Sequence, residues 1–194
     1  MKKVQDAKRY EHTLGVAFTA AALAMRYDCD IQDAQTAGLL HDCAKCMSDE
    51  KRLAICKKRQ IHMTEVEKKS PFLLHAKVGA YLAAEKYGIK NQDILNAIQN
   101  HTTGRPGMSS LEKIIFIADY IEPGRSQAPN LAKIRKLAFV NLDQALLAIL
   151  EDTLSYLKTT GSSLDPMTER TWLYYRDMER CEIKENDRSE VNGQ

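Results

Sequence analysis

The sequence predicts an all-α protein, and three observations lead to this prediction. No segment of the 194 residues alternates apolar and polar side chains over several positions, which is the pattern of a half-buried strand. Apolar side chains recur instead at helical spacing, as at Leu146, Ile149 and Leu150. Residues that typically begin or end helices separate these amphipathic segments. We therefore expect a chain built from helices alone.

Start and stop signals define the helices of the first half. Asp30 with Asp33 is typical of an N-terminal cap, and the small side chains around Gly38 would let a neighbouring helix approach closely. Ser70 followed by Pro71 begins a helix, because proline in the first turn loses only an N–H group that would be unpaired. The predicted helices are 6–27, 31–42, one that starts after Ser48, and 72–87, which stops at Gly88.

The second half follows the same rules. Asn91 caps a helix that runs to His101, and Ser109 with Glu112 three residues later forms a capping box ahead of an apolar helix. Pro and Gly residues mark loops at 102–107 and 161–166. The predicted helices are 91–101, 109–121, 131–139, 142–158 and a last amphipathic segment that includes Trp172.

Length and composition narrow the class of protein. The 194 residues suit a single domain at 1–180, followed by a polar tail at 181–194 that we expect to be flexible. A net charge of +2 gives no basic footprint for coating nucleic acid, and a mean hydropathy of −0.42 excludes an integral membrane protein. Five cysteines without a disulfide framework, and no apolar leader after Met1, predict a cytoplasmic protein with reduced thiols.

Histidines and aspartates form the candidate site. Asp119 lies inside the apolar run 114–121, where a buried carboxylate is costly unless it is paired or bound to a metal. His12 and the adjacent pair His41 and Asp42 lie on or at the end of other predicted helices. Imidazole nitrogen with carboxylate oxygen suits iron, manganese or zinc better than magnesium or calcium. The residue types therefore indicate a transition-metal site.

Five blocks of sequence resemble a known family. They are 9–16 (RYEHTLGV), 41–45 (HDCAK), 75–80 (HAKVGA), 101–104 (HTTG) and 118–125 (ADYIEPGR). His12, the His41–Asp42 pair and Asp119 match the H…HD…D pattern of HD-domain metal-dependent phosphohydrolases. Together the blocks resemble the YqeK-type HD proteins, bacterial symmetrical hydrolases that split diadenosine tetraphosphate (Ap4A) into two ADP. The resemblance covers residues 8–178 and implies an HD-domain helical bundle.

The resemblance also implies roles for individual residues. One divalent metal, iron in the family's usual description, would be held by His12, His41, Asp42 and Asp119. The implied catalytic residues are Asp42, Lys45, His75 and His101, and either histidine would donate a proton to the departing ADP. The implied substrate contacts are Arg9, Asp42, Lys45, His75, His101, Asp119, Arg125 and the loop Ser162, Ser163, Leu164, Asp165, Pro166 and Met167. The expected reaction is attack of a metal-activated water on a central phosphorus.

Several alternatives stay open. His75 and His101 are alternative ligands of a second ion, and the substrate could be a nucleoside monophosphate, a dNTP, a guanosine polyphosphate or a cyclic nucleotide. A non-catalytic nucleotide-binding regulator is the alternative outside enzymes. Cys43 and Cys46 form a C-x-x-C pair, which we interpret as incidental rather than half a zinc site or a redox pair. We expect a small-molecule substrate, no nucleic-acid or membrane partner, and leave a homodimer open.

Overall fold

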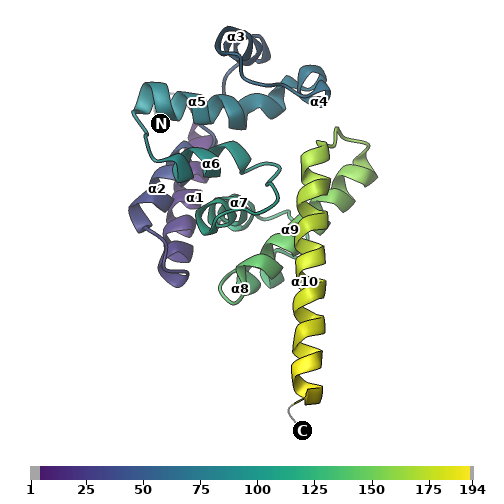
Figure 1. Ribbon diagram of the computed structural model, residues 1–194. Helices are drawn as coiled ribbons and strands as arrows, with labels where there is room; N and C mark the ends of the chain where they lie inside the picture. Colours follow the sequence, from purple (N-terminus) through teal and green to yellow (C-terminus); the bar gives the residue numbers. More distant parts are fainter. Residues whose placement is uncertain (1–4, 193–194) are drawn as a thin grey trace.

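The computed structural model describes residues 5–192, with side chains described up to residue 181. Within these residues it contains ten α-helices, one short 3-10 helix (η1) and no strand, which confirms the all-α prediction (Figure 1). The elements are α1 (Ala7–Arg26), α2 (Ile31–Leu40), α3 (Asp49–Arg59), α4 (Glu65–Lys69), η1 (Pro71–Leu74), α5 (His75–Tyr87), α6 (Gln92–Asn100), α7 (Ser110–Ile121), α8 (Leu131–Ala138), α9 (Leu142–Thr160) and α10 (Pro166–Asn192).

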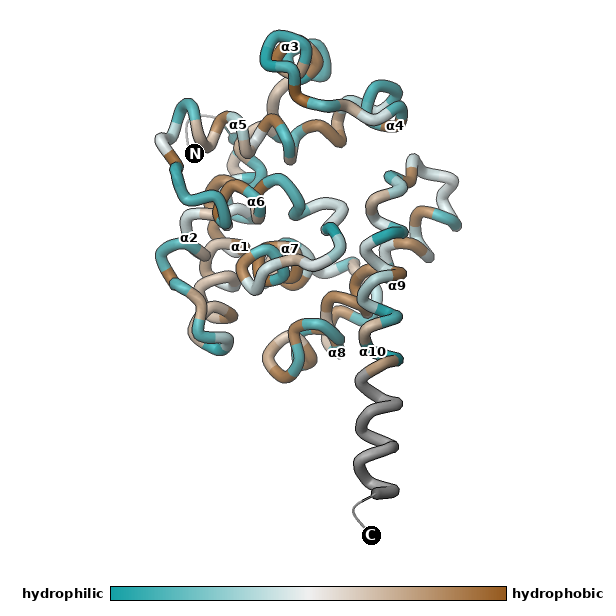
Figure 2. The backbone as a smooth tube through the Cα atoms, in the orientation of Figure 1, coloured by the Kyte–Doolittle hydropathy of each residue, from teal (hydrophilic) through white to brown (hydrophobic). Residues whose placement is uncertain are grey.

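Helix α7 lies in the middle of the bundle. It packs against α1, α2, α6 and α9, and Ile114, Ile115 and Ile117 are fully buried. Figure 2 shows hydrophobic segments on α7 and α9 and hydrophilic ones on α3 and α4 at the periphery. The predicted capping box is present, because Ser109 and Glu112 each accept the backbone N–H of the other. The fold thereby holds Asp119, in the last turn of α7, beside the core.

Helices α1 and α2 approach each other closely, as the small side chains of α2 predict. A Cβ atom at Gly38 would lie 2.8 Å from the Cα atom of Ala17, and Ala34 and Ala37 beside it are fully buried. This contact brings His12, the predicted ligand on α1, near the end of α2, which is directly followed by His41.

Three local predictions are corrected by the structure. Helix α2 ends at Leu40 instead of continuing to Asp42, because the chain turns there through short-range bonds such as Lys45 N–H to the Asp42 carbonyl. The predicted helix 72–87 is divided into η1 and α5. Helix α4 was not predicted, although Thr64 and Glu67 form its capping box.

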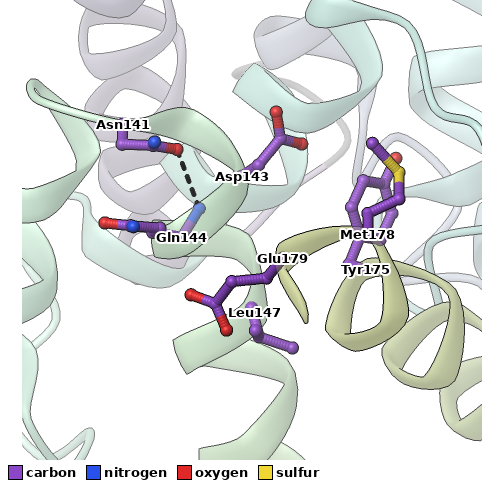
Figure 3. Close-up of a pocket in the computed structure, with 7 residues that line it drawn as sticks. All are labelled: Asn141, Asp143, Gln144, Leu147, Tyr175, Met178 and Glu179. Atoms are coloured by element: carbon purple, nitrogen blue, oxygen red, sulfur yellow. Dashed lines mark hydrogen bonds between the residues drawn. The ribbon is translucent and has the colours of Figure 1, made fainter. Parts of the chain in front are cut away.

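The C-terminal hairpin of α9 and α10 packs against α7 and α8 through α9. Tyr175 on α10 is buried, and its hydroxyl accepts the backbone N–H of Met108 at 2.9 Å. A small hollow near it, between the start of α9 and α10, contains none of the predicted ligands (Figure 3). Helix α10 continues to Asn192, so the backbone of tail residues 181–192 is helical, while the flexibility of that tail stays a prediction. Of the described helices, none combines the length and apolarity needed to cross a bilayer.

Candidate metal centre

The predicted site residues lie at the ends of four helices and in the first half of α1. His12 is on α1, His41 and Asp42 directly follow α2, and His101 directly follows α6. His75 begins α5, and Asp119 is in the last turn of α7. The ends of these four helices lie close together, and each end contributes one or two of the site side chains.

Three histidine rings are oriented by the turn that precedes them. The Nδ1 atoms of His41, His75 and His101 lie 2.6–2.7 Å from the carbonyl oxygens of Gly38, Phe72 and Ile98, three residues earlier in each case. A carbonyl only accepts hydrogen bonds, so each Nδ1 carries the proton that it donates, and each Nε2 has a lone pair wherever the ring is neutral. All three rings therefore present the nitrogen that binds a metal or accepts a proton.

The ligand atoms form overlapping groups of three, each compact enough to hold an ion. Those of His12, His41 and Asp42 lie within 4.8 Å of one another, as do those of His41, His101 and Asp119 and those of Asp42, His75 and His101. His41 Nε2 and Asp42 Oδ1 are buried without a well-oriented hydrogen bond, and so is His12 Nε2, which faces Asp119 Oδ1 at 3.1 Å. Buried polar atoms normally have a partner, so these three atoms fit a divalent metal bound between them.

Burial and neighbouring charges favour the protonation states that metal ligands need at three of the four predicted ligands. His12 is the exception, because burial would lower its pKa but the carboxylates of Asp119 and Glu122 outweigh burial and raise it. Burial lowers the pKa of His41, which keeps the ring neutral. Burial alone would raise the pKa of Asp42, but the neighbouring His101 and His41 outweigh it and hold that pKa well below its usual range. The pKa of Asp119 is likewise lowered against the effect of burial, by His12 and His41. Neutral imidazole and ionised carboxylate are the forms that bind divalent metals.

His75 differs from the donor that the resemblance implies. Burial, with the charges of His101 and Lys45, lowers the pKa of His75 to about 3. Its Nε2 atom lies 3.0 Å from Lys45 Nζ and 3.2 Å from His101 Nε2. A neutral His75 would accept a hydrogen bond from the ammonium group of Lys45, and burial lowers the pKa of that lysine too.

Three cations surround the cluster. Arg9 Nη1 lies 2.8 Å from Asp42 Oδ2, and Arg125 Nη2 lies 2.8 Å from Asp119 Oδ1. The side chains of Arg9, Lys45 and Arg125 are 33%, 32% and 45% exposed. Each of these cations is therefore partly open to solvent beside a predicted ligand.

Comparison with known proteins agrees with this geometry. The HD domain model matches residues 9–124, which is more than half of the chain and includes all four predicted ligands. The chain belongs to the HD-domain family. A crystal structure described as a predicted HD superfamily hydrolase involved in NAD metabolism, from Clostridium acetobutylicum, has a TM-score of 0.88 and 41% identity, covering 91% of this chain and 93% of that one.

Curated relatives of this HD-domain protein confirm the narrower resemblance. A symmetrical bis(5′-nucleosyl)-tetraphosphatase from Bacillus subtilis is 42% identical over 89% of this chain and 91% of its own length. A protein of the same name from Halalkalibacterium halodurans is 42% identical over 84% of this chain and 87% of its own length. The similarity therefore extends well beyond the matched domain.

The predicted substrate loop, residues 162–167, connects α9 to α10. Pro166 and Met167 belong to the first turn of α10, and Asp165 caps that helix by accepting the N–H of Met167. Ser163 contacts the first half of the chain, because its hydroxyl lies 2.9 Å from that of Ser70, which directly precedes η1. Contact of residues 162–167 with substrate stays a prediction.

The interpretation of the C-x-x-C pair as incidental agrees with the structure. Cys43 Sγ donates to the carbonyl oxygen of Gly79 at 3.5 Å, whereas Cys46 is exposed, and both thiols are free. Burial and the neighbouring Asp42 raise the pKa of Cys43 to about 12, which is opposite to the shift of a reactive thiol.

One buried residue beside the ligands had no predicted role. Glu122 is only 3% exposed and contacts His12 Nδ1 at 3.1 Å. The available signal was a glutamate three residues after Asp119 and directly before the Pro123–Gly124 turn. That spacing follows one helical turn and so brings Glu122 back to the face of α7 that carries the ligand.

Proposed function

We propose that this HD-domain protein hydrolyses Ap4A symmetrically to two ADP in a metal-dependent reaction. The observation that carries the proposal is that His12, His41 and Asp42 form one compact ligand group and that His12 Nε2 also faces Asp119 Oδ1 at 3.1 Å. The relatives that share 42% identity over most of the chain are named symmetrical bis(5′-nucleosyl)-tetraphosphatases, which supports this substrate and this position of cleavage.

The proposed cofactor is one divalent transition metal, with iron as the ion. Its proposed ligands are His12, His41, Asp42 and Asp119. When bound, such a metal supplies a water of lowered pKa and a positive charge beside the phosphate. Metal analysis of anaerobically purified protein identifies the ion, and a content near two ions per chain would assign His75 and His101 to a second one.

The surrounding cations are proposed to bind and orient the polyphosphate. A dinucleoside tetraphosphate carries about four negative charges, which the small net charge of the chain cannot attract, so local cations are required. Arg9 and Arg125 each keep N–H donors beyond those that face a carboxylate. Lys45 and Arg125 would stabilise the charge that develops on the attacked phosphate. The proton for the departing ADP oxygen would come from the group of Lys45, His75 and His101.

Product analysis tests the reaction directly. With Ap4A as the only substrate, we expect ADP as the only nucleotide product, whereas AMP together with ATP would exclude symmetrical cleavage. Asp42→Ala should lose bound metal and turnover together, and Asp177→Ala on the exposed face of α10 should lose neither. Wild-type turnover by metal-stripped Asp42→Ala protein would overturn the proposal.

The same assays address the remaining predictions. Faster turnover of a nucleoside monophosphate, dNTP, guanosine polyphosphate or cyclic nucleotide than of Ap4A would reassign the substrate. Nucleotide binding without hydrolysis by the metal-loaded chain would favour a regulator. We also propose a cytoplasmic protein, which the free thiols support, and leave self-association to a measurement of mass in solution.

A further inference from the structure

Glu122 lies against the Nδ1 atom of His12, whereas Asp119 lies against the Nε2 atom. Its Oε1 atom is 3.1 Å from His12 Nδ1, and its Oε2 atom accepts the backbone N–H of Gly124 at 2.5 Å. The side chain is 4% exposed. Both carboxylate oxygens therefore have a partner within the protein, and the remaining ring nitrogen of His12 faces Asp119 at 3.1 Å.

Two glycines leave the space that this carboxylate occupies. A Cβ atom at Gly15 would lie 2.5 Å from Glu122 Oε2, and one at Gly124 would lie 3.0 Å from the same atom. Gly15 is on α1, three residues after His12, so the helix that carries the ligand is shaped to admit Glu122. The carbonyl of Glu122 is held as well, because Arg135 Nη2 donates to it at 2.8 Å.

We propose that Glu122 is a positioning residue that holds His12 as the tautomer protonated at Nδ1, so that Nε2 is offered to the metal. The inference rests on the metal centre of the proposed function and adds a residue that acts on the ion only through His12. His41, His75 and His101 obtain the same orientation from a carbonyl three residues earlier. His12 differs, since its ring nitrogen is matched by a carboxylate from a segment 110 positions away.

The geometry requires a carboxylate at this position rather than an amide. Glu122 accepts two hydrogen bonds from two donors, one from the His12 ring and one from the Gly124 backbone. Glutamine has nearly the same shape but only one acceptor oxygen. If that oxygen serves Gly124, the NH₂ group faces His12 Nδ1 and favours the tautomer protonated at Nε2, which cannot bind a metal through Nε2. Partners of this kind typically change metal affinity 10–100-fold.

The test compares zinc affinity, measured by competition with a chelator, in wild-type protein, Glu122→Gln and Glu67→Gln. Glu67 is a matched control because it is also 3% exposed and also accepts one backbone N–H, from Thr64, and one side-chain donor, Lys77. We expect Glu122→Gln to bind zinc about 10–100-fold more weakly and Glu67→Gln to match wild type, even where both lower the Tm of the metal-free chain.

A second measurement uses wild-type protein and does not depend on a variant that folds. In ¹⁵N-histidine NMR spectra of the zinc-loaded chain, with His12 assigned by the signal missing from His12→Gln, we expect a proton on Nδ1 and none on Nε2. A His12 ring bound through Nδ1, or equal zinc affinity in Glu122→Gln and wild type, would overturn the inference alone. Failure of wild-type protein to bind zinc or iron would overturn the proposed metal centre together with it.

Discussion

At the scale of single residues, Lys45 links the predicted metal ligands to the predicted phosphate contacts. Its Nζ atom lies 3.0 Å from His75 Nε2 and 3.9 Å from Asp42 Oδ1. Lysine is not a ligand here, so its loss should affect the substrate rather than the ion. We expect Lys45→Met to lower kcat/KM for Ap4A by about 10²–10³-fold, the effect of removing one group that stabilises transition-state charge, with metal content unchanged.

Steady-state kinetics and metal analysis of the same samples decide this prediction. Lys90→Met, an exposed lysine on another part of the surface, serves as the control for charge alone and should behave as wild type. Loss of metal together with activity in Lys45→Met would show that the lysine supports the ligands instead. An unchanged kcat/KM in Lys45→Met would show that Lys45 is not one of the catalytic residues.

The residues of the site differ in how far they could be predicted. His12, His41, Asp42 and Asp119 were predicted as a set, and the structure brings them together, because imidazoles and carboxylates in otherwise apolar helices need a metal or a charged partner. No role was predicted for Glu122. Its contact with His12 depends on the Pro123–Gly124 turn and on the space beside Gly15, and sequence spacing alone predicts neither. The neutral state of His75 depends on burial, which sequence reasoning could not supply.

At the scale of the elements, the contact between α1 and α2 sets the distance between two ligands. Gly38→Ala would place a Cβ atom 2.8 Å from the Cα atom of Ala17, a backbone atom that cannot move aside. We expect the variant to lose about 1–3 kcal/mol of unfolding free energy through overpacking. It should also bind metal more weakly, because separating the helices moves His41 away from His12. Thermal unfolding of the metal-free chain and zinc titration measure the two effects.

Gly79→Ala is the matched control for this prediction. Gly79 is also a buried helical glycine, on α5, but its nearest neighbours would lie 3.4 Å or more from the added Cβ, which is ordinary contact. The variant should match or exceed wild-type stability, by up to about 1 kcal/mol, since alanine favours helix over glycine. Equal losses in both variants would mean that the two glycines serve helix geometry in general and not the approach of α1 and α2.

The start of a helix was predicted correctly where the sequence contains a clear capping residue. The capping box at Ser109 begins α7 as predicted, and Asn91 caps α6 through its side chain. Prediction was wrong where competing local bonds decide the outcome. Pro71 does open a helical turn, but its first four residues close with 3-10 geometry before His75, where the ring itself bonds to the Phe72 carbonyl. Helix α4 has only five residues, too few for an apolar pattern to develop.

At the scale of the whole molecule, the ligands and the C-terminal hairpin occupy different parts of the chain. All four predicted ligands lie between His12 and Asp119, on α1, after α2 and on α7. The hairpin of α9 and α10 joins this part through the core around α7, through Tyr175 and through the Ser70–Ser163 contact. The hairpin thus stabilises the bundle and carries residues 162–167, while the predicted metal ligands and the predicted cationic phosphate contacts all lie between Arg9 and Arg125.

Deletion of residues 182–194 tests the predicted limits of the domain. On α10 the buried side chains are those of Thr168, Thr171 and Tyr175, and the residues that follow, up to Cys181, are exposed or partly exposed. We therefore expect the shortened chain to keep its Tm, metal content and kcat/KM.

Tyr175→Ala in the full chain is the contrasting variant, because it removes a buried ring and the partner of the Met108 N–H, at a cost of about 3 kcal/mol or more. For a chain of this size that corresponds to a fall in Tm of about 6–12 °C. A similar fall in Tm on deletion of 182–194 would show that the domain extends through the tail. The exposed surface of α10 would then have to be covered by residues of that tail, or by a second copy of the chain that the tail binds.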